Sequence, residues 1–158
     1  MTALALSING QVRQVQAALP DTLLTVLRDQ LLITSAKRGC NQGVCGACTV
    51  LIDGRPQRAC LTLAANCEGA ASTTIEGFRR DAAMGRLQRA FESSGAVQCG
   101  FCTAGILISA HALLKQTAMP SVDQIRAGLS GNLCRCTGYR KIIDAVAAAA
   151  GAAVEAGT

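Results

Sequence analysis

Eight of the nine cysteines in this 158-residue chain fall into two sets of four, each with its own spacing. The first set is Cys40, Cys45, Cys48 and Cys60, and the second set is Cys99, Cys102, Cys134 and Cys136. A two-iron, two-sulfur cluster is held by four thiolates, and the C-x4-C-x2-C spacing of the first set is of the plant-ferredoxin type. The sequence therefore predicts two iron–sulfur clusters and a function in electron transfer.

Disulfide bonds are a weaker explanation for these cysteines. Nine cysteines in 158 residues fall below the roughly 8–10% that is typical of a small disulfide-linked secreted chain, and their odd number leaves one unpaired. The N-terminal residues lack the basic region and cleavage pattern of a signal peptide, and the first basic residue is Arg13. We therefore expect a reducing, cytoplasmic environment, in which clustered cysteines bind metals. Export together with a partner stays open.

Zinc also binds four thiolates and is the more serious alternative. Structural zinc sites usually combine two short C-x2-4-C knuckles, whereas the first set places three cysteines within nine residues. Gly39, Gly43 and Gly46 lie beside or between those cysteines, and glycine allows backbone amides to approach a cluster closely. The first set therefore favours an iron–sulfur cluster, while the spacing of the second set alone is compatible with either metal.

The composition argues against nucleic-acid binding and against a membrane span. The chain has a net charge of only +5, and its 3% of aromatic residues offer no stacking platform for bases. Residues 93–114 carry no charge, but they include cysteines, Gln98 and His111, whose polar groups are costly in lipid. We therefore expect this segment to form a helix buried in protein, with no direct insertion into a membrane.

The first half of the chain predicts an α+β fold. Alternating apolar residues from Leu4 to Ile8 precede Asn9-Gly10, which predicts a hairpin, and Asp53-Gly54 predicts a second one. A leucine-rich helix is expected to begin after Pro20, with Asp21 as its N-cap. The expected strands are residues 4–8, 11–16, 49–52, 55–60 and, as a possible last strand, 73–75.

The second half of the chain predicts helices only. After Gly77 the apolar residues follow helical spacing, Gly95 is the expected end of one helix, and Ser121 begins a capping-box pattern. The expected helices are residues 84–94, 102–114, 121–129 and a last one from about 137. We therefore expect one domain over residues 1–77 and a second, all-helical domain over residues 78–158.

Three longer motifs around the cysteines carry a resemblance to a known family. They are CNQGVCGACTV from residue 40, CGFCTAG from residue 99 and SGNLCRCTGY from residue 130. Together they resemble the small iron–sulfur subunit of the molybdenum hydroxylases, the family of xanthine dehydrogenase and aldehyde oxidoreductase, and all eight cysteine positions fit. The resemblance favours iron and sulfur at the second site as well. It implies a ferredoxin-like β-grasp domain followed by an all-α four-helix domain.

The same resemblance implies a place in an electron-transfer chain. The cluster of the helical domain would lie next to a molybdopterin cofactor held by a separate large subunit. Electrons would pass from there to the first-set cluster, and then to an FAD-binding medium subunit, a cytochrome or another acceptor. Gln98 matches a glutamine of the family that hydrogen-bonds the pterin, and Cys136 matches the ligand closest to the pterin.

The sequence contains no convincing acid–base pair, nucleophile or phosphate-binding loop, so catalytic groups are expected in a partner and not in this chain. If the resemblance holds, the chain acts within an oxidoreductase as its iron–sulfur subunit. Two other hypotheses stay open on the sequence: a zinc-stabilised structural or adaptor protein, and a free-standing ferredoxin-type carrier.

Five further residues attract attention in the sequence but are not predicted to be cluster ligands. Cys67, the ninth cysteine, is expected to be a small buried hydrophobe, and His111 to be packed or partner-facing rather than a ligand. Arg135 and Arg140 either add positive charge near the second cluster or are ordinary solvated side chains. Ala104 stands where the family commonly has proline, so the first turn of the helix that follows would be slightly looser.

Overall fold

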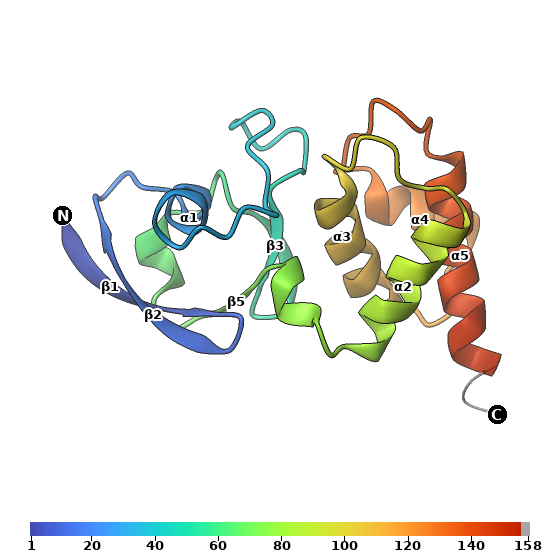
Figure 1. Ribbon diagram of the computed structural model, residues 1–158, viewed down its shortest axis with the longest axis horizontal. Helices are drawn as coiled ribbons and strands as arrows, with labels where there is room; N and C mark the ends of the chain where they lie inside the picture. The colour runs from blue at the N-terminus through green and yellow to red at the C-terminus, as the bar shows by residue number, and fades with distance from the viewer. Residues whose placement is uncertain (156–158) are drawn as a thin grey trace.

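The computed structural model describes the backbone of residues 1–155 and the side chains of residues 1–151, and it places a sheet-containing half beside a helical half (Figure 1). The strands are β1 (Thr2–Ile8), β2 (Gln11–Ala17), β3 (Thr49–Ile52), β4 (Arg55–Arg58) and β5 (Ala71–Thr73). They form one sheet in the order β2-β1-β5-β3-β4. Strands β1 and β5 are parallel, and the other neighbouring pairs are antiparallel. A mixed sheet followed by helices is therefore the architecture of the chain.

Both predicted hairpins are confirmed. Asn9-Gly10 turns the chain between β1 and β2 at φ angles of 53° and 77°, and Asp53-Gly54 does so between β3 and β4 at 48° and 78°. Positive φ at both turn residues is the requirement of a two-residue type I′ turn, and these sequences meet it at little steric cost. The alternation from Leu4 to Ile8 buries Leu4, Leu6 and Ile8 on the core side of β1.

The last strand lies two residues earlier than the sequence predicted. Strand β5 ends at Thr73, and residues Ile75–Phe78 form a short 3-10 helix, η3. The reason is a side chain from the first hairpin turn: Asn9 Oδ1 accepts the backbone N–H of Thr74 at 2.8 Å. That amide is therefore not available to the sheet, and the chain leaves the strand direction.

The short helix against the sheet begins one residue later than predicted. Helix α1 (Leu23–Thr25) continues into the π-helical turn η1 (Val26–Gln30). Its N-cap is Thr22, whose hydroxyl accepts the N–H of Thr25 at 3.2 Å. Asp21 is not the cap, because its carboxylate instead accepts the N–H of Ala18 at 2.7 Å and closes the preceding turn.

Helices make up the second half of the described chain. They are α2 (Ala82–Ser93), α3 (Thr103–Gln116), α4 (Val122–Leu129) and α5 (Arg140–Glu155). The capping box at Ser121 is confirmed, with both of its hydrogen bonds present. Helix α2 ends at Gly95 as predicted, in a Schellman pattern in which Ala96 N–H donates to Phe91 C=O at 2.8 Å. Helix α5 begins at Arg140 and not at Thr137, since Tyr139 has a φ of 69°.

Each half has its own apolar core. One buried cluster lies between the sheet and α1, and a second is enclosed by α2, α3, α4 and α5. A small third cluster of Leu51, Ile108 and Ala112 joins them where β3 meets α3. The second part of the uncharged segment lies in α3, in which every residue from Gly105 to Ala112 is buried as predicted, whereas residues 94–102 form the loop before it. Among the described helices, none combines the length and the apolar character needed to cross a membrane.

Candidate iron–sulfur sites

All the cysteines of both sets lie in loops or at element ends, and the loops point to one edge of the molecule. The loop between η1 and β3 carries three cysteines of the first set, and Cys60 follows β4. The second set comes from the loop between α2 and α3 and from the loop between α4 and α5. These loops protrude on the upper side of Figure 1, where the two halves of the chain meet.

The thiols of the first set are arranged in two pairs. The thiols of Cys40 and Cys45 are close enough to influence each other, and so are those of Cys48 and Cys60. Cys48 and Cys60 are buried, whereas Cys40 and Cys45 are half-buried. The pairs thus form an inner and an outer half of one site, although Cys60 comes from a different part of the chain.

Backbone amides surround the outer pair. The N–H groups of Cys45 and Gln42 point at Cys40 Sγ, at 3.3 Å and 3.4 Å. Hydrogen bonds from these amides lower the pKa of the Cys40 thiol to about 6, because they stabilise the thiolate. Burial raises the pKa of the Cys48 thiol to about 11, and the neighbouring thiol of Cys60 adds to this. The thiol of Cys40, in the outer pair, is therefore more easily ionised than the thiol of Cys48, in the inner pair.

Two glycines allow this loop to close around its sulfurs. A Cβ at Gly39 would lie 2.8 Å from Cys45 Sγ, too close for any other residue type without movement. Gly46 has a φ of 74°, and a Cβ there would lie 2.3 Å from the carbonyl oxygen of Gly131. The interleaved glycines that the sequence singled out thus have a steric reason at these two positions.

The second set also forms two pairs. The sulfurs of Cys99 and Cys136 are 3.5 Å apart and exposed, and the thiol of Cys102 is close enough to the half-buried Cys134 to influence it. Burial raises the pKa of Cys102 to about 12, with a further contribution from the Cys134 thiol. Burial opposes ionisation of Cys134 too, but hydrogen bonds from Thr137 outweigh it and lower the pKa of Cys134.

Two side chains that the cysteine spacing does not reveal support the second site. The hydroxyl of Tyr139 accepts the N–H of Cys134 at 2.8 Å and donates to the carbonyl of Asn132 at 3.1 Å. No local pattern marks this role, because it depends on the left-handed φ of Tyr139 itself. Gln98, which the sequence did single out, donates from Nε2 to the carbonyl of Cys136 at 3.3 Å. Gln98 and Cys136 therefore lie together at the exposed end of the site.

The donor sets fit a two-iron cluster. Each iron of such a cluster takes two thiolates, and each set of four sulfurs here is divided into two pairs. Among the residues that the structure describes, no group of three or more Cys, His, Asp or Glu side chains is placed to hold a single metal ion. A bound 2Fe–2S cluster would supply one-electron redox chemistry at each site.

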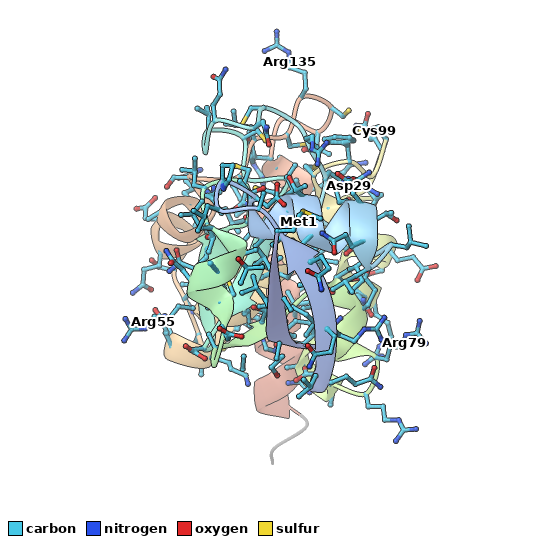
Figure 2. All side chains as sticks on the ribbon, turned by 90° about the vertical axis from the view of Figure 1, so that its left-hand side faces the viewer. Met1, Asp29, Arg55, Arg79, Cys99 and Arg135 are labelled. Atoms are coloured by element: carbon cyan, nitrogen blue, oxygen red, sulfur yellow. The ribbon has the colours of Figure 1, made fainter. Side chains whose placement is uncertain are left out.

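Of the remaining candidate residues, Cys67 and His111 are buried, whereas Arg140 and Arg135, which lies between two cysteines of the second set, are exposed. Cys67 is buried in the sheet-side core, and burial raises the pKa of its thiol, so the prediction of a small buried hydrophobe is confirmed. His111 is buried in α3, with Nε2 at 3.3 Å from Asp81 Oδ1, and is packed as predicted. Arg135 points away from the molecule (Figure 2), and Arg140 is an exposed partner of Asp144. Their positions fit solvated side chains.

Comparisons with known proteins agree with this geometry. Residues 5–84 match the family model of a 2Fe-2S iron-sulfur cluster binding domain, and residues 74–147 match that of a [2Fe-2S] binding domain. The chain is 48% identical to the nicotine 6-hydroxylase small subunit of Paenarthrobacter nicotinovorans, over 91% of this chain and 87% of the relative. One family model thus spans the first set of cysteines, and the other spans the second set.

Solved structures give the same result. The chain matches quinoline 2-oxidoreductase from Pseudomonas putida 86 with a TM-score of 0.89 and 45% identity, over 98% of this chain and 96% of that one. It matches the aldehyde oxidoreductase of Desulfovibrio desulfuricans ATCC 27774 with a TM-score of 0.90 and 42% identity, over 98% of this chain and 17% of that much longer one. The chain belongs to the small iron–sulfur subunits of the molybdenum hydroxylase family.

Proposed function

We propose that this chain transfers electrons within a molybdenum hydroxylase, from a molybdopterin cofactor in a large partner subunit toward an FAD or another acceptor. The observation that carries the proposal is the pairing of the sulfurs. Each set of four cysteines offers two thiols to each of two irons, and the loops that carry the two sets protrude on the same side of the molecule. The chain supplies ligands and amides only, so hydroxylation of the substrate falls to the large subunit.

The proposed ligand sets follow the two pairings. Cys40, Cys45, Cys48 and Cys60 hold the first cluster, and Cys99, Cys102, Cys134 and Cys136 hold the second. We further assign each cluster to its own domain, a ferredoxin-like β-grasp domain over residues 1–77 and a four-helix domain over residues 78–158. The mixed sheet with one helix against it and the two separate apolar cores support this division.

The direction of electron flow is argued from exposure. Cys99 and Cys136 are exposed, and Gln98 lies beside Cys136 with its side chain amide free to donate a further hydrogen bond. This is the end of the second site that a partner's pterin could reach, and Gln98 and Cys136 are the proposed contacts. From this exposed end, electrons would pass through the second cluster to the first cluster.

One backbone–backbone hydrogen bond links the two cysteine loops directly. The backbone N–H of Leu133, the residue before Cys134, donates to the carbonyl of Cys45 at 2.8 Å. Cys134 and Cys45 belong to different ligand sets, so this bond provides a short bonded route between the sites. The outer pair of the first set, Cys40 and Cys45, then leads to the acceptor side, where a medium FAD-binding subunit or a cytochrome would dock.

We propose the cytoplasm as the place of action, because a reducing compartment keeps thiols available to hold iron–sulfur clusters. No nucleic-acid contact is proposed. The zinc-stabilised alternative loses its support because both halves of the chain match iron–sulfur family models.

Metal and sulfide analysis of the purified chain tests the proposal. About four iron atoms and four acid-labile sulfides per chain are expected, together with two distinct paramagnetic signals after reduction. One or two zinc atoms in their place would overturn it. Co-purification is the second measurement, since an electron-transfer subunit should bring a large pterin-binding chain, whereas a free carrier should elute alone.

A further inference from the structure

The two cysteine loops meet around a buried asparagine. Asn132 lies between α4 and Cys134, and only 3% of its surface is exposed. Its side chain reaches across to the first cysteine loop, where Nδ2 donates to the carbonyl of Gly46 at 3.1 Å and to the hydroxyl of Thr49 at 3.2 Å. Gly46 lies between Cys45 and Cys48. Asn132 therefore touches the ligand loop of the site to which it does not belong.

The side chain of Asn132 is fully satisfied. Its Oδ1 accepts the hydroxyl of Ser109, from the buried helix α3, at 2.8 Å. Because the carbonyl of Gly46 can only accept, the atom that faces it must be the amide nitrogen, and the Ser109 contact fits the oxygen. The hydroxyl of Thr49 accepts from Asn132 and also from Arg58 Nη1 at 2.8 Å, and it donates to Gly46. Arg58 Nη2 donates in turn to the carbonyl of Gly131.

The backbone of Asn132 holds its own loop. Its carbonyl accepts the hydroxyl of Tyr139, which accepts the N–H of Cys134. One residue thus bonds to the first loop through its side chain and to the second loop through its main chain. Removal of one partner from a buried network leaves the others unpaired, and each unsatisfied buried group destabilises the folded state.

Backbones approach closely around this network. A Cβ at Gly105, in the first turn of α3, would lie 2.4 Å from the carbonyl oxygen of Gly46. The Gly46 carbonyl is therefore held between the Asn132 amide and the start of α3. This contact leaves no space for the first loop to slide along the helical half.

We infer that Asn132 is a positioning residue that fixes the separation and orientation of the two clusters, so that electron transfer between them occurs at one defined geometry. The inference rests on the proposed function, and it adds a role for a residue that ligates neither cluster. Asn132 holds the carbonyl of Gly46 in place, and the adjacent N–H of Leu133 then meets the carbonyl of Cys45 at 2.8 Å.

The test compares Asn132→Ala with Ser109→Ala in the intact complex. Both variants lose the bond between α3 and Asn132, but only Asn132→Ala loses the two bonds to the first loop. We expect Asn132→Ala to keep both clusters, with the individual g values of each unchanged, and to lose the resolved spin–spin splitting between the two reduced clusters. Electron transfer between clusters after flash reduction should slow in parallel. Ser109→Ala should keep the splitting and the rate.

A second pair of variants keeps the inference testable should Asn132→Ala not fold. Gly105→Ala places a Cβ 2.4 Å from the Gly46 carbonyl oxygen and 3.2 Å from Asn132 Nδ2, so it forces the first loop away from α3 while removing no side chain of the network, and alanine favours the helix itself. Gly85→Ala in α2 is its control, because the only neighbour there is the flexible end of Arg89. The spin–spin splitting and the rate of electron transfer between the clusters should change in Gly105→Ala and stay unchanged in Gly85→Ala.

The inference is wrong if Asn132→Ala or Gly105→Ala retains four irons with unaltered splitting and rate. It is also wrong if each changes the g values of one cluster as strongly as the splitting, which would indicate a local effect on a ligand. An unmodified chain that lacks iron would overturn the proposed function instead, so the two failures are distinguishable.

Discussion

At the scale of single residues, Cys136 allows the two sites to be separated by experiment. Its sulfur is paired with that of Cys99 and is exposed, and neither residue contacts the first set. We expect Cys136→Ser to lower the iron content from about four to about two per chain and to leave the first cluster's signal intact. Reduction of the first cluster by substrate should then fail, while chemical reduction of it should succeed.

Cys40→Ser is the matched comparison for Cys136→Ser, since it removes one outer sulfur of the other set. It should abolish the first signal and leave reduction of the second cluster by substrate in place. Loss of both signals in either variant would contradict the assignment of one cluster to each half.

The proposed ligands follow from the spacing of the cysteines, whereas the side chains that bond to their loops could not be predicted from sequence. Spacing within a short loop reports on local geometry, so the C-x4-C-x2-C run identifies a cluster loop by itself. Asn132 reads as an ordinary polar loop residue, because its partners Gly46 and Thr49 are more than eighty residues away. Tyr139 likewise depends on a left-handed backbone conformation that nothing in its neighbours indicates.

At the scale of elements, prediction succeeded where the determining contacts are local. Asn9-Gly10 sets its turn through its own φ angles, and the box at Ser121 lies within one helical turn. It was wrong where a polar group is already occupied by a hydrogen bond that the sequence pattern does not show. Asn9 takes the amide of Thr74 and ends β5 early, and the Asp21 carboxylate is occupied by Ala18, so Thr22 becomes the cap.

The contact between α3 and the start of α2 gives a prediction for pH dependence. Burial lowers the pKa of His111, although the carboxylate of Asp81 opposes this, and Lys115 nearby lowers it further. The unfolded chain therefore binds a proton at His111 more readily than the folded chain, so stability is complete above the ordinary histidine pKa of about 6.5 and falls below it.

This dependence can be measured with His111→Gln. The thermal midpoint of the unmodified protein should fall between about pH 7.5 and about pH 5.5, and part of that fall should be missing in the variant. The difference between the two proteins isolates the histidine from the acid sensitivity of the clusters. Equal slopes for both proteins would show that His111 does not titrate on unfolding in this range.

At the scale of the whole molecule, the edge that carries the second site is also apolar. Val97, Phe101 and Leu133 belong to its two loops and are 43%, 46% and 51% exposed. Cys99 lies at the same edge in Figure 2. Apolar side chains around an exposed pair of ligands fit a surface that a partner covers, because they exclude water from the contact. The edge therefore combines the proposed cofactor contact with the proposed docking surface.

Phe101 should be the main anchor of that surface, since buried aromatic side chains dominate binding energy at interfaces. We expect Phe101→Ala to weaken binding of the large subunit by about tenfold or more, which corresponds to at least about 1.4 kcal/mol. Val12→Ala is the control, because Val12 is 70% exposed on β2, at the opposite end of Figure 1 from α5. Its affinity should not change. Iron analysis of both variants separates docking from cluster loss: a Phe101→Ala chain with its full iron content and unchanged affinity would place the docking surface elsewhere.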